Sequence, residues 1–168
     1  MDNRKLSLAI IMANVNRVKS LLESGRCSIN EPGLAFCLPI IACVNHPPLH
    51  YSKNNDAARR KILKVLVAHC AHLNIQSENN GKTAAIVAAE NGFLKCLQFL
   101  VQAGADLSLT SQRGKTALIA AAKASHYKCV ECLIHHTGAE LNVEDADGYT
   151  ALMWALEREI VLQLCLRC

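Results

Sequence analysis

Residues 81–89, with the sequence GKTAAIVAA, recur twice further along the chain. Residues 114–122 read GKTALIAAA, 33 positions later, and residues 148–155 read GYTALMWA after a further 34 positions. A second segment shows the same spacing, because GADL at 104–107 returns as GAEL at 138–141. A fixed period of this length indicates short supersecondary units stacked in a row.

Each repeated unit has the residues needed to form two short helices. Thr83, Thr116 and Thr150 stand where a first helix would begin, and a threonine hydroxyl there can accept a hydrogen bond from a first-turn amide. The alanine-rich residues that follow are good helix formers, and their small side chains allow close packing. Gly92 would end the first helix, and residues 93–101 have the apolar spacing of a second one.

The pattern resembles the ankyrin repeat, which implies an all-α solenoid of stacked helix-turn-helix units. In that family the first helix opens on Thr-Pro-Leu-His, whereas this chain has Thr-Ala-Ala-Ile at 83–86, Thr-Ala-Leu-Ile at 116–119 and Thr-Ala-Leu-Met at 150–153. The hydrogen bonds that the family's histidine makes between neighbouring units are therefore not expected. The alanine face, the glycine stops and the aliphatic second helix remain, so the expected fold is unchanged.

The period extends to the whole chain and predicts a single domain, residues 1–168. The second unit carries an insertion, because Cys70 follows its counterpart Gly25 by 45 residues, 12 more than the period of 33. We expect this excess around Asn45 to Arg60, where two consecutive prolines would end a helix. The predicted domain has about five units, the last incomplete: 2–33, 34–77, 78–110, 111–144 and 145–168, called units one to five below.

Composition excludes several classes of function. The longest apolar runs are shorter than the roughly 20 residues that a membrane helix needs, and the N-terminus has no secretory-type apolar segment. A net charge of +4 without clustering gives no reason to expect nucleic acid as a partner. The motifs of nucleotide and metalloprotease sites are absent from the sequence. We therefore expect a protein that is not an enzyme and binds no cofactor. We expect its location to be the cytoplasm and/or the nucleus.

The nine cysteines favour reduced, buried thiols over disulfides. Cys96 and Cys129 occupy the same position of successive units, which is a core position of the second helix. Cys129, Cys132 and His136 have ligand types that zinc accepts and would share one helix face. Because Cys132 aligns with the apolar Phe99, we interpret this group as core and predict no metal site and no activated cysteine.

Two segments depart from the repeat pattern. Residues 46–51 of the insertion, HPPLHY, offer histidines and a tyrosine to a ligand, although a solvated loop is the simpler interpretation. Residues 159–168 are mostly apolar, whereas a terminal repeat normally has a polar outer face. Either the chain is a truncated product of a longer protein, or this segment is an apolar cap that meets a partner.

The resemblance implies a non-catalytic module that binds another protein through its turn tips and the exposed side of its first helices. The middle of this candidate binding surface is rich in lysine and arginine, which suggests a partner with an acidic segment. Trp154 is either a partly exposed anchor or a core residue. The candidate binding residues are Asn79, Asn80, Lys82, Glu90, Asn91, Gln112, Arg113, Lys115, Lys123, Asp147, Tyr149, Trp154, Glu157 and Arg158.

Within this class the chain would be an adaptor, scaffold or targeting subunit. Two alternatives stay open at this point. One is a thiol- or metal-responsive regulator that uses the cysteine and histidine excess. The other is the substrate receptor of a ubiquitin ligase, although the sequence shows no recruitment box for it. The oligomeric state is not predicted.

Overall fold

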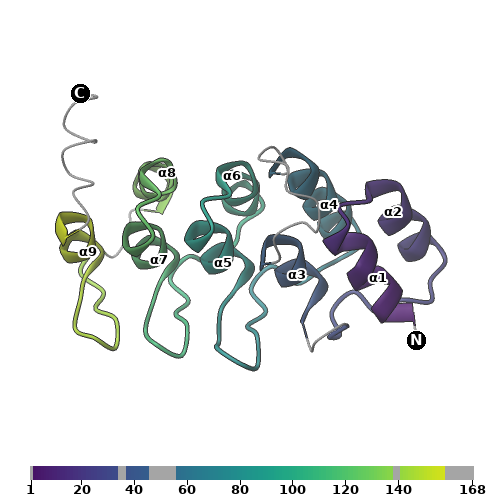
Figure 1. Ribbon diagram of the computed structural model, residues 1–168, viewed down its shortest axis with the longest axis horizontal. Coiled ribbons are helices and arrows are strands. Elements are labelled where there is room, and N and C mark those ends of the chain that lie inside the picture. Colours follow the sequence, from purple (N-terminus) through teal and green to yellow (C-terminus); the bar gives the residue numbers. More distant parts are fainter. Residues whose placement is uncertain (1, 34–36, 46–55, 138–140, 158–168) are drawn as a thin grey trace.

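The computed structural model describes residues 2–33, 37–45, 56–137 and 141–157, and its regular elements there are all α-helices in two layers (Figure 1). The lower layer of Figure 1 contains the first helix of each unit: α1 (Asp2–Ile11), α3 (Pro39–Asn45), α5 (Ala84–Glu90), α7 (Ala117–Lys123) and α9 (Ala151–Glu157). The upper layer contains the second helices: α2 (Val15–Glu23), α4 (Asp56–Ala68), α6 (Leu94–Gln102) and α8 (Tyr127–Thr137). The predicted all-α solenoid is confirmed.

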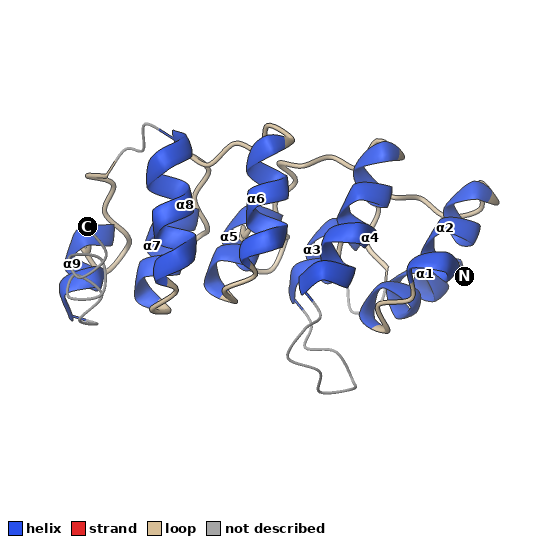
Figure 2. Cartoon of the chain, turned by 90° about the horizontal axis from the view of Figure 1, so that it is seen from above, coloured by secondary structure: helices blue, strands red, loops and turns tan. Residues whose placement is uncertain are grey.

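Each helix from α1 to α8 packs against its partner in the same unit, and equivalent helices of successive units pack against each other, as α7 does against α9 (Figure 2). One continuous apolar core runs between the two layers as a result. Leu100 of α6 and Leu133 of α8 have at most 1% of their surface exposed. Stacking is what buries these faces, because two helices of seven to eleven residues have too little apolar surface to form a core alone. Within the described ranges, no helix has both the length and the apolar character needed to cross a bilayer.

The signals that were expected to start and stop the helices do so. The hydroxyls of Thr83, Thr116 and Thr150 accept hydrogen bonds from the third backbone N–H that follows each, at 3.2–3.3 Å. Cys70 stands at the position where other units have glycine and adopts φ +65°, the left-handed conformation that normally favours glycine. The alignment of this unit by its helix end is therefore correct.

Part of the insertion is helical. We expect the extra residues around Asn45 to Arg60, and four of them extend the start of α4, which begins at Asp56 and has 13 residues against nine in α6. The first residue of this added turn makes a hydrogen-bonded cap between units. The carboxylate of Asp56 accepts from the backbone N–H groups of Lys95 (2.8 Å) and Cys96 (3.1 Å) in the first turn of α6. Phe93, which precedes α6, offers no side-chain cap of its own.

The loops between units project from the first-helix layer and end in three similar turns (Figure 1). We call these turns tip three (residues 77–82), tip four (111–115) and tip five (145–149). Each tip is bonded to the next through the backbone: Gln112 N–H donates to Asn80 O at 3.0 Å, and Ala146 N–H donates to Arg113 O at 2.9 Å. Gly81 is required here twice over, because its φ is +66° and a Cβ would approach Gln112 N to 2.9 Å.

Candidate protein-binding surface

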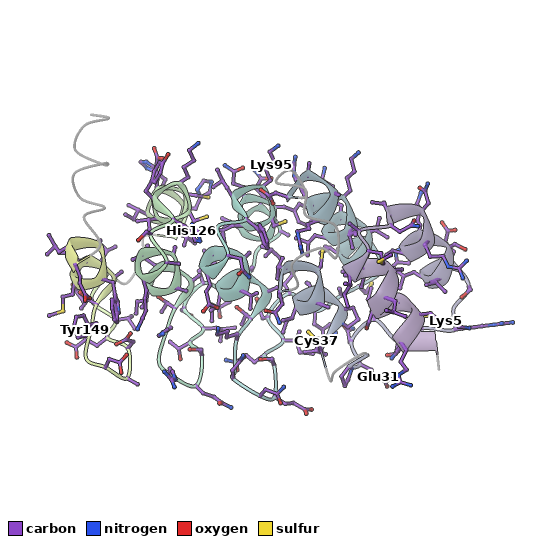
Figure 3. The ribbon with its side chains drawn as sticks, viewed as in Figure 1. Lys5, Glu31, Cys37, Lys95, His126 and Tyr149 are labelled. Carbon is purple, nitrogen blue, oxygen red and sulfur yellow. The ribbon has the colours of Figure 1, made fainter. Side chains whose placement is uncertain are left out.

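Six of the predicted binding residues are exposed on the three tips, all on one side of the solenoid. Figure 3 shows Tyr149 on this side of α9, whereas Lys95 lies on the second-helix layer above. Because the backbone hydrogen bonds described above join tip to tip, these side chains form one row. Its exposed members are Asn79, Asn80, Gln112, Arg113, Asp147 and Tyr149.

The first helices α5 and α7 offer a partner little beyond their ends. Every residue from 84 to 89 in α5 and from 117 to 122 in α7 is buried. Alanine and short aliphatic side chains let these helices pack closely, so little of their surface remains for a partner. What remains accessible is the helix ends, where Glu90 and Lys123 are half-buried.

Some candidate residues also have structural roles. The side chain of Asn80 accepts a hydrogen bond from the backbone N–H of Lys82 at 3.0 Å, which shapes tip three. The amide of Gln112 donates to a carbonyl of the preceding tip at 3.3 Å. The amide of Asn91 donates to the carbonyl of Val44 in α3 at 3.0 Å. The side chains of Gln112 and Asn91 therefore help to hold neighbouring units together.

The basic middle of the surface is partly neutralised by the protein itself. Lys82, just before α5, pairs with Glu90 at the end of the same helix at 2.5 Å. Lys123 pairs with Asp147 of tip five at 3.6 Å. Both lysines therefore have a carboxylate partner within the protein. The pairs are half-exposed, so each contributes little to stability, but each fixes a lysine head group.

Trp154 belongs to the core, with 8% of its surface exposed. Its indole N–H donates to Oδ2 of Asp145 at 3.0 Å, and Lys123 Nζ lies 3.6 Å from the centre of its ring. The ring of Tyr149 stacks on it with centroids 4.6 Å apart, and Tyr149 itself is 39% exposed. Of the two alternatives for Trp154, the core position is correct and the exposed anchor is wrong. Tyr149 is the accessible aromatic of this end.

Asp145 organises tip five and was missed by the sequence reasoning. Burial alone would raise the pKa of its carboxyl, but the N–H groups of Tyr149, Trp154 and Asp147 and the charge of Lys123 together lower it. The missed signal is a substitution at a repeated position, since tips three and four have Ser77 and Ser111 there. A carboxylate has the additional acceptor sites that this network uses.

Of the lysines Lys82, Lys115 and Lys123, Lys115 is the one with no salt bridge to a described residue. It stands one period after Lys82 and is half-buried. Burial lowers the pKa of its amine and the positive charge of Lys123 lowers it further, whereas Asp145 and Glu90 raise it. Neither Asp145 nor Glu90 forms a salt bridge with Lys115, and no other described residue does.

The cysteines considered as zinc ligands or nucleophiles are core residues. Cys129 and Cys132 are 1% and 8% exposed, and burial raises the pKa of Cys129 to about 12. The same cause raises the pKa of Cys43 to about 12 and that of Cys96 further. A thiol that resists ionisation is a poor nucleophile. The described part of the chain contains no group of three or more metal-ligating side chains.

The remaining candidates lie at the end of the described chain or beyond it. Glu157 is exposed at the end of α9, where Leu152 and Leu156 are 62% and 59% exposed. Their counterparts Leu118 and Ala122 in α7 are covered by neighbouring helices. Arg158, the apolar segment 159–168 and the insertion residues 46–51 lie outside the described residues.

A comparison with protein-family models matches the model "Ankyrin repeats (3 copies)" to residues 6–111 and 103–167. The chain therefore belongs to the ankyrin repeat family. Ankyrin repeats generally mediate protein–protein interactions and are typically non-catalytic. A comparison with curated proteins found no match.

Proposed function

We propose that this chain is a non-catalytic adaptor, scaffold or targeting subunit that binds its partner across tips three to five. The observation that carries the proposal is the direct bonding of the tips, from Asn80 to Gln112 and from Arg113 to Ala146. Exposed side chains on loops fixed in this way need little further ordering when a partner docks, which lowers the entropic cost of binding. Asn79, Arg113 and Tyr149 supply amide, cationic and aromatic contacts along the row.

The partner, in this proposal, contributes an acidic segment. The cations available to it are in unit four, since Lys82 and Lys123 are already paired. Arg113 is exposed at tip four and Lys115 follows two residues later. Opposite charge at the edge of an interface mainly accelerates association.

The seven described cysteines without a disulfide suit a reducing compartment, so we propose the cytoplasm and/or the nucleus as the location. A thiol-responsive regulator is less well supported than an adaptor, because burial raises the pKa of Cys43, Cys96 and Cys129. A ubiquitin-ligase receptor is one form of the adaptor class, and no observed contact distinguishes it within that class.

Site-specific photo-crosslinking tests the proposed surface. A photoreactive amino acid is placed at Asn79, Arg113 or Tyr149 on the tips and, as matched controls, at the exposed Lys64 of α4 and Lys128 of α8. After irradiation in cell extract, the tip positions should crosslink to a common partner that the second-helix positions do not capture. Crosslinking of that partner only from α4 and α8 would place the interface on the other layer and contradict the proposal.

A further inference from the structure

Units three and four carry opposite charges at one position on the accessible face of their first helices. In unit three, Lys82 before α5 is matched by Glu90 at the end of α5, 2.5 Å away. In unit four, the same two positions are Lys115 and Lys123, because each follows its counterpart by 33 residues. A lysine therefore stands where unit three has its carboxylate.

Lys123 does not fill that place, because it points to the next unit. Its ammonium group lies 3.6 Å from Oδ2 of Asp147 and 3.6 Å from the centre of the Trp154 ring. A carboxylate and an aromatic face both attract a cation, so these contacts hold Lys123 toward tip five. Lys115 experiences the charges of Lys123, Glu90 and Asp145, and it forms no salt bridge with a described carboxylate. Two like charges in a half-buried position favour an incoming anion.

We propose that Lys115 receives one aspartate or glutamate side chain of the partner protein, which takes in unit four the place that Glu90 holds in unit three. This inference rests on the proposed protein-binding function and names the chemistry of one contact. Arg113, exposed on tip four, attracts the same acidic segment from a distance. A nearby anion would also stabilise the protonated amine of Lys115 and so raise its pKa.

The test uses the full chain and a blocked hexaglutamate peptide as probe, with a blocked hexaglutamine peptide as the uncharged control. Carbon-13 NMR at the lysine Cε atoms follows each amine separately. Hexaglutamate should shift the Lys115 signal and move its titration midpoint to higher pH, and hexaglutamine should do neither. An unchanged Lys115 midpoint at saturating hexaglutamate would overturn the proposal.

Matched variants separate a specific contact from general attraction. Lys115→Gln should weaken hexaglutamate binding about threefold or more, whereas Lys82→Gln should weaken it less, because Lys82 is already paired with Glu90 and its loss leaves only the Glu90 carboxylate to repel the peptide. Glu90→Gln frees Lys82 and should strengthen binding. Lys123→Glu places a carboxylate at the Glu90 position of unit four and should abolish the shift at Lys115. Equal losses from Lys115→Gln and Lys82→Gln would mean that the peptide responds only to net charge, and would refute the proposal.

The partner found by photo-crosslinking distinguishes this inference from the function on which it rests. If that partner binds through the tips and Lys115→Gln weakens it, while Arg113→Gln mainly slows association, both stand. If the partner binds through the tips and its affinity for the Lys115→Gln variant equals its affinity for the unaltered chain, the carboxylate contact is wrong. The interaction module is still supported in that case.

Discussion

Asp56 accepts a hydrogen bond at 3.1 Å from the backbone N–H of Cys96, 40 residues further along the chain. The second oxygen of the same carboxylate accepts from Lys95, so the first residue of α4 caps the first turn of α6. A cap satisfies amides that have no partner inside the helix and places a negative charge at the positive end of the helix dipole. Here it also joins unit two to unit three.

Removing this cap should destabilise the domain. We expect Asp56→Ala to lower the free energy of unfolding by about 1 kcal/mol, as for other N-cap residues, in urea titrations followed by circular dichroism. Asp56→Asn, which keeps one acceptor, should have a smaller effect. Glu78→Ala, an exposed carboxylate change on tip three, is the control. Equal effects of Asp56→Ala and Glu78→Ala would show that the cap is not used in solution.

Two glycines with positive φ should respond differently to alanine. Gly104→Ala costs about 1 kcal/mol for a left-handed alanine, because a Cβ at Gly104 meets nothing within 4 Å. Gly81→Ala should cost at least about twice as much, because its Cβ also approaches Gln112 N to 2.9 Å and pushes tip four away. Thermal unfolding of the two variants compares them directly, and equal melting temperatures would disprove the contact between the tips.

The Trp154–Asp145 hydrogen bond should stabilise unit five. Trp154→Phe keeps an aromatic ring but removes the indole donor, which leaves the buried carboxylate with one partner fewer. We expect a loss of about 2 kcal/mol, typical of a bond to a charged group, measured by urea unfolding with far-ultraviolet circular dichroism. Tyr149→Phe keeps the ring stacked on Trp154 and should be neutral. A neutral Trp154→Phe would refute this role.

Stability should fall at alkaline pH because of the buried thiols. Burial raises the pKa of Cys43 and Cys129 from 9.0 to about 12, so the folded state holds these protons while the unfolded chain releases them. The contribution of these thiols to the free energy of unfolding is complete below pH 9 and is lost as the pH rises toward 12. For the fully buried Cys43 the loss at pH 10 is on the order of 1 kcal/mol.

Urea midpoints between pH 8 and 10.5 measure the slope of stability against pH. Cys43→Ala should flatten the slope even though it leaves a small cavity that lowers stability at every pH. Replacement of the exposed Cys70 by alanine is the control, since it removes a thiol without opening the core. An unchanged slope in Cys43→Ala would contradict the assignment.

The proposed attraction of an acidic partner predicts a kinetic effect. Reversing two charges in unit four, with Arg113→Glu and Lys115→Glu together, should slow association with the crosslinked partner. The effect should fade as salt rises, because charges are screened over roughly 8 Å at physiological ionic strength. Surface plasmon resonance at two salt concentrations measures it, and stability should change by no more than about 0.5 kcal/mol. An unaffected association rate would locate the contact elsewhere.

Part of the surface could be predicted from the sequence and part could not. The period placed Asn79, Arg113 and Tyr149 on exposed tips, since a repeated turn puts equivalent residues at equivalent places. It could not predict that Lys82 and Lys123 are paired, because the repeated backbone does not fix the direction of a lysine side chain. Lys82 turns along its own helix and Lys123 toward the next unit.

The sequence by itself determined the architecture. Threonine caps, alanine-rich first helices, glycine stops and the period of 33 to 34 residues are local signals, and each acts within its own unit or between equal neighbours. Only the tertiary structure decided which side chains cross from one unit to another. Asp56 caps α6, and Trp154 is buried on Asp145. Such contacts depend on the distance between stacked units and on side-chain direction, which a one-dimensional period does not encode.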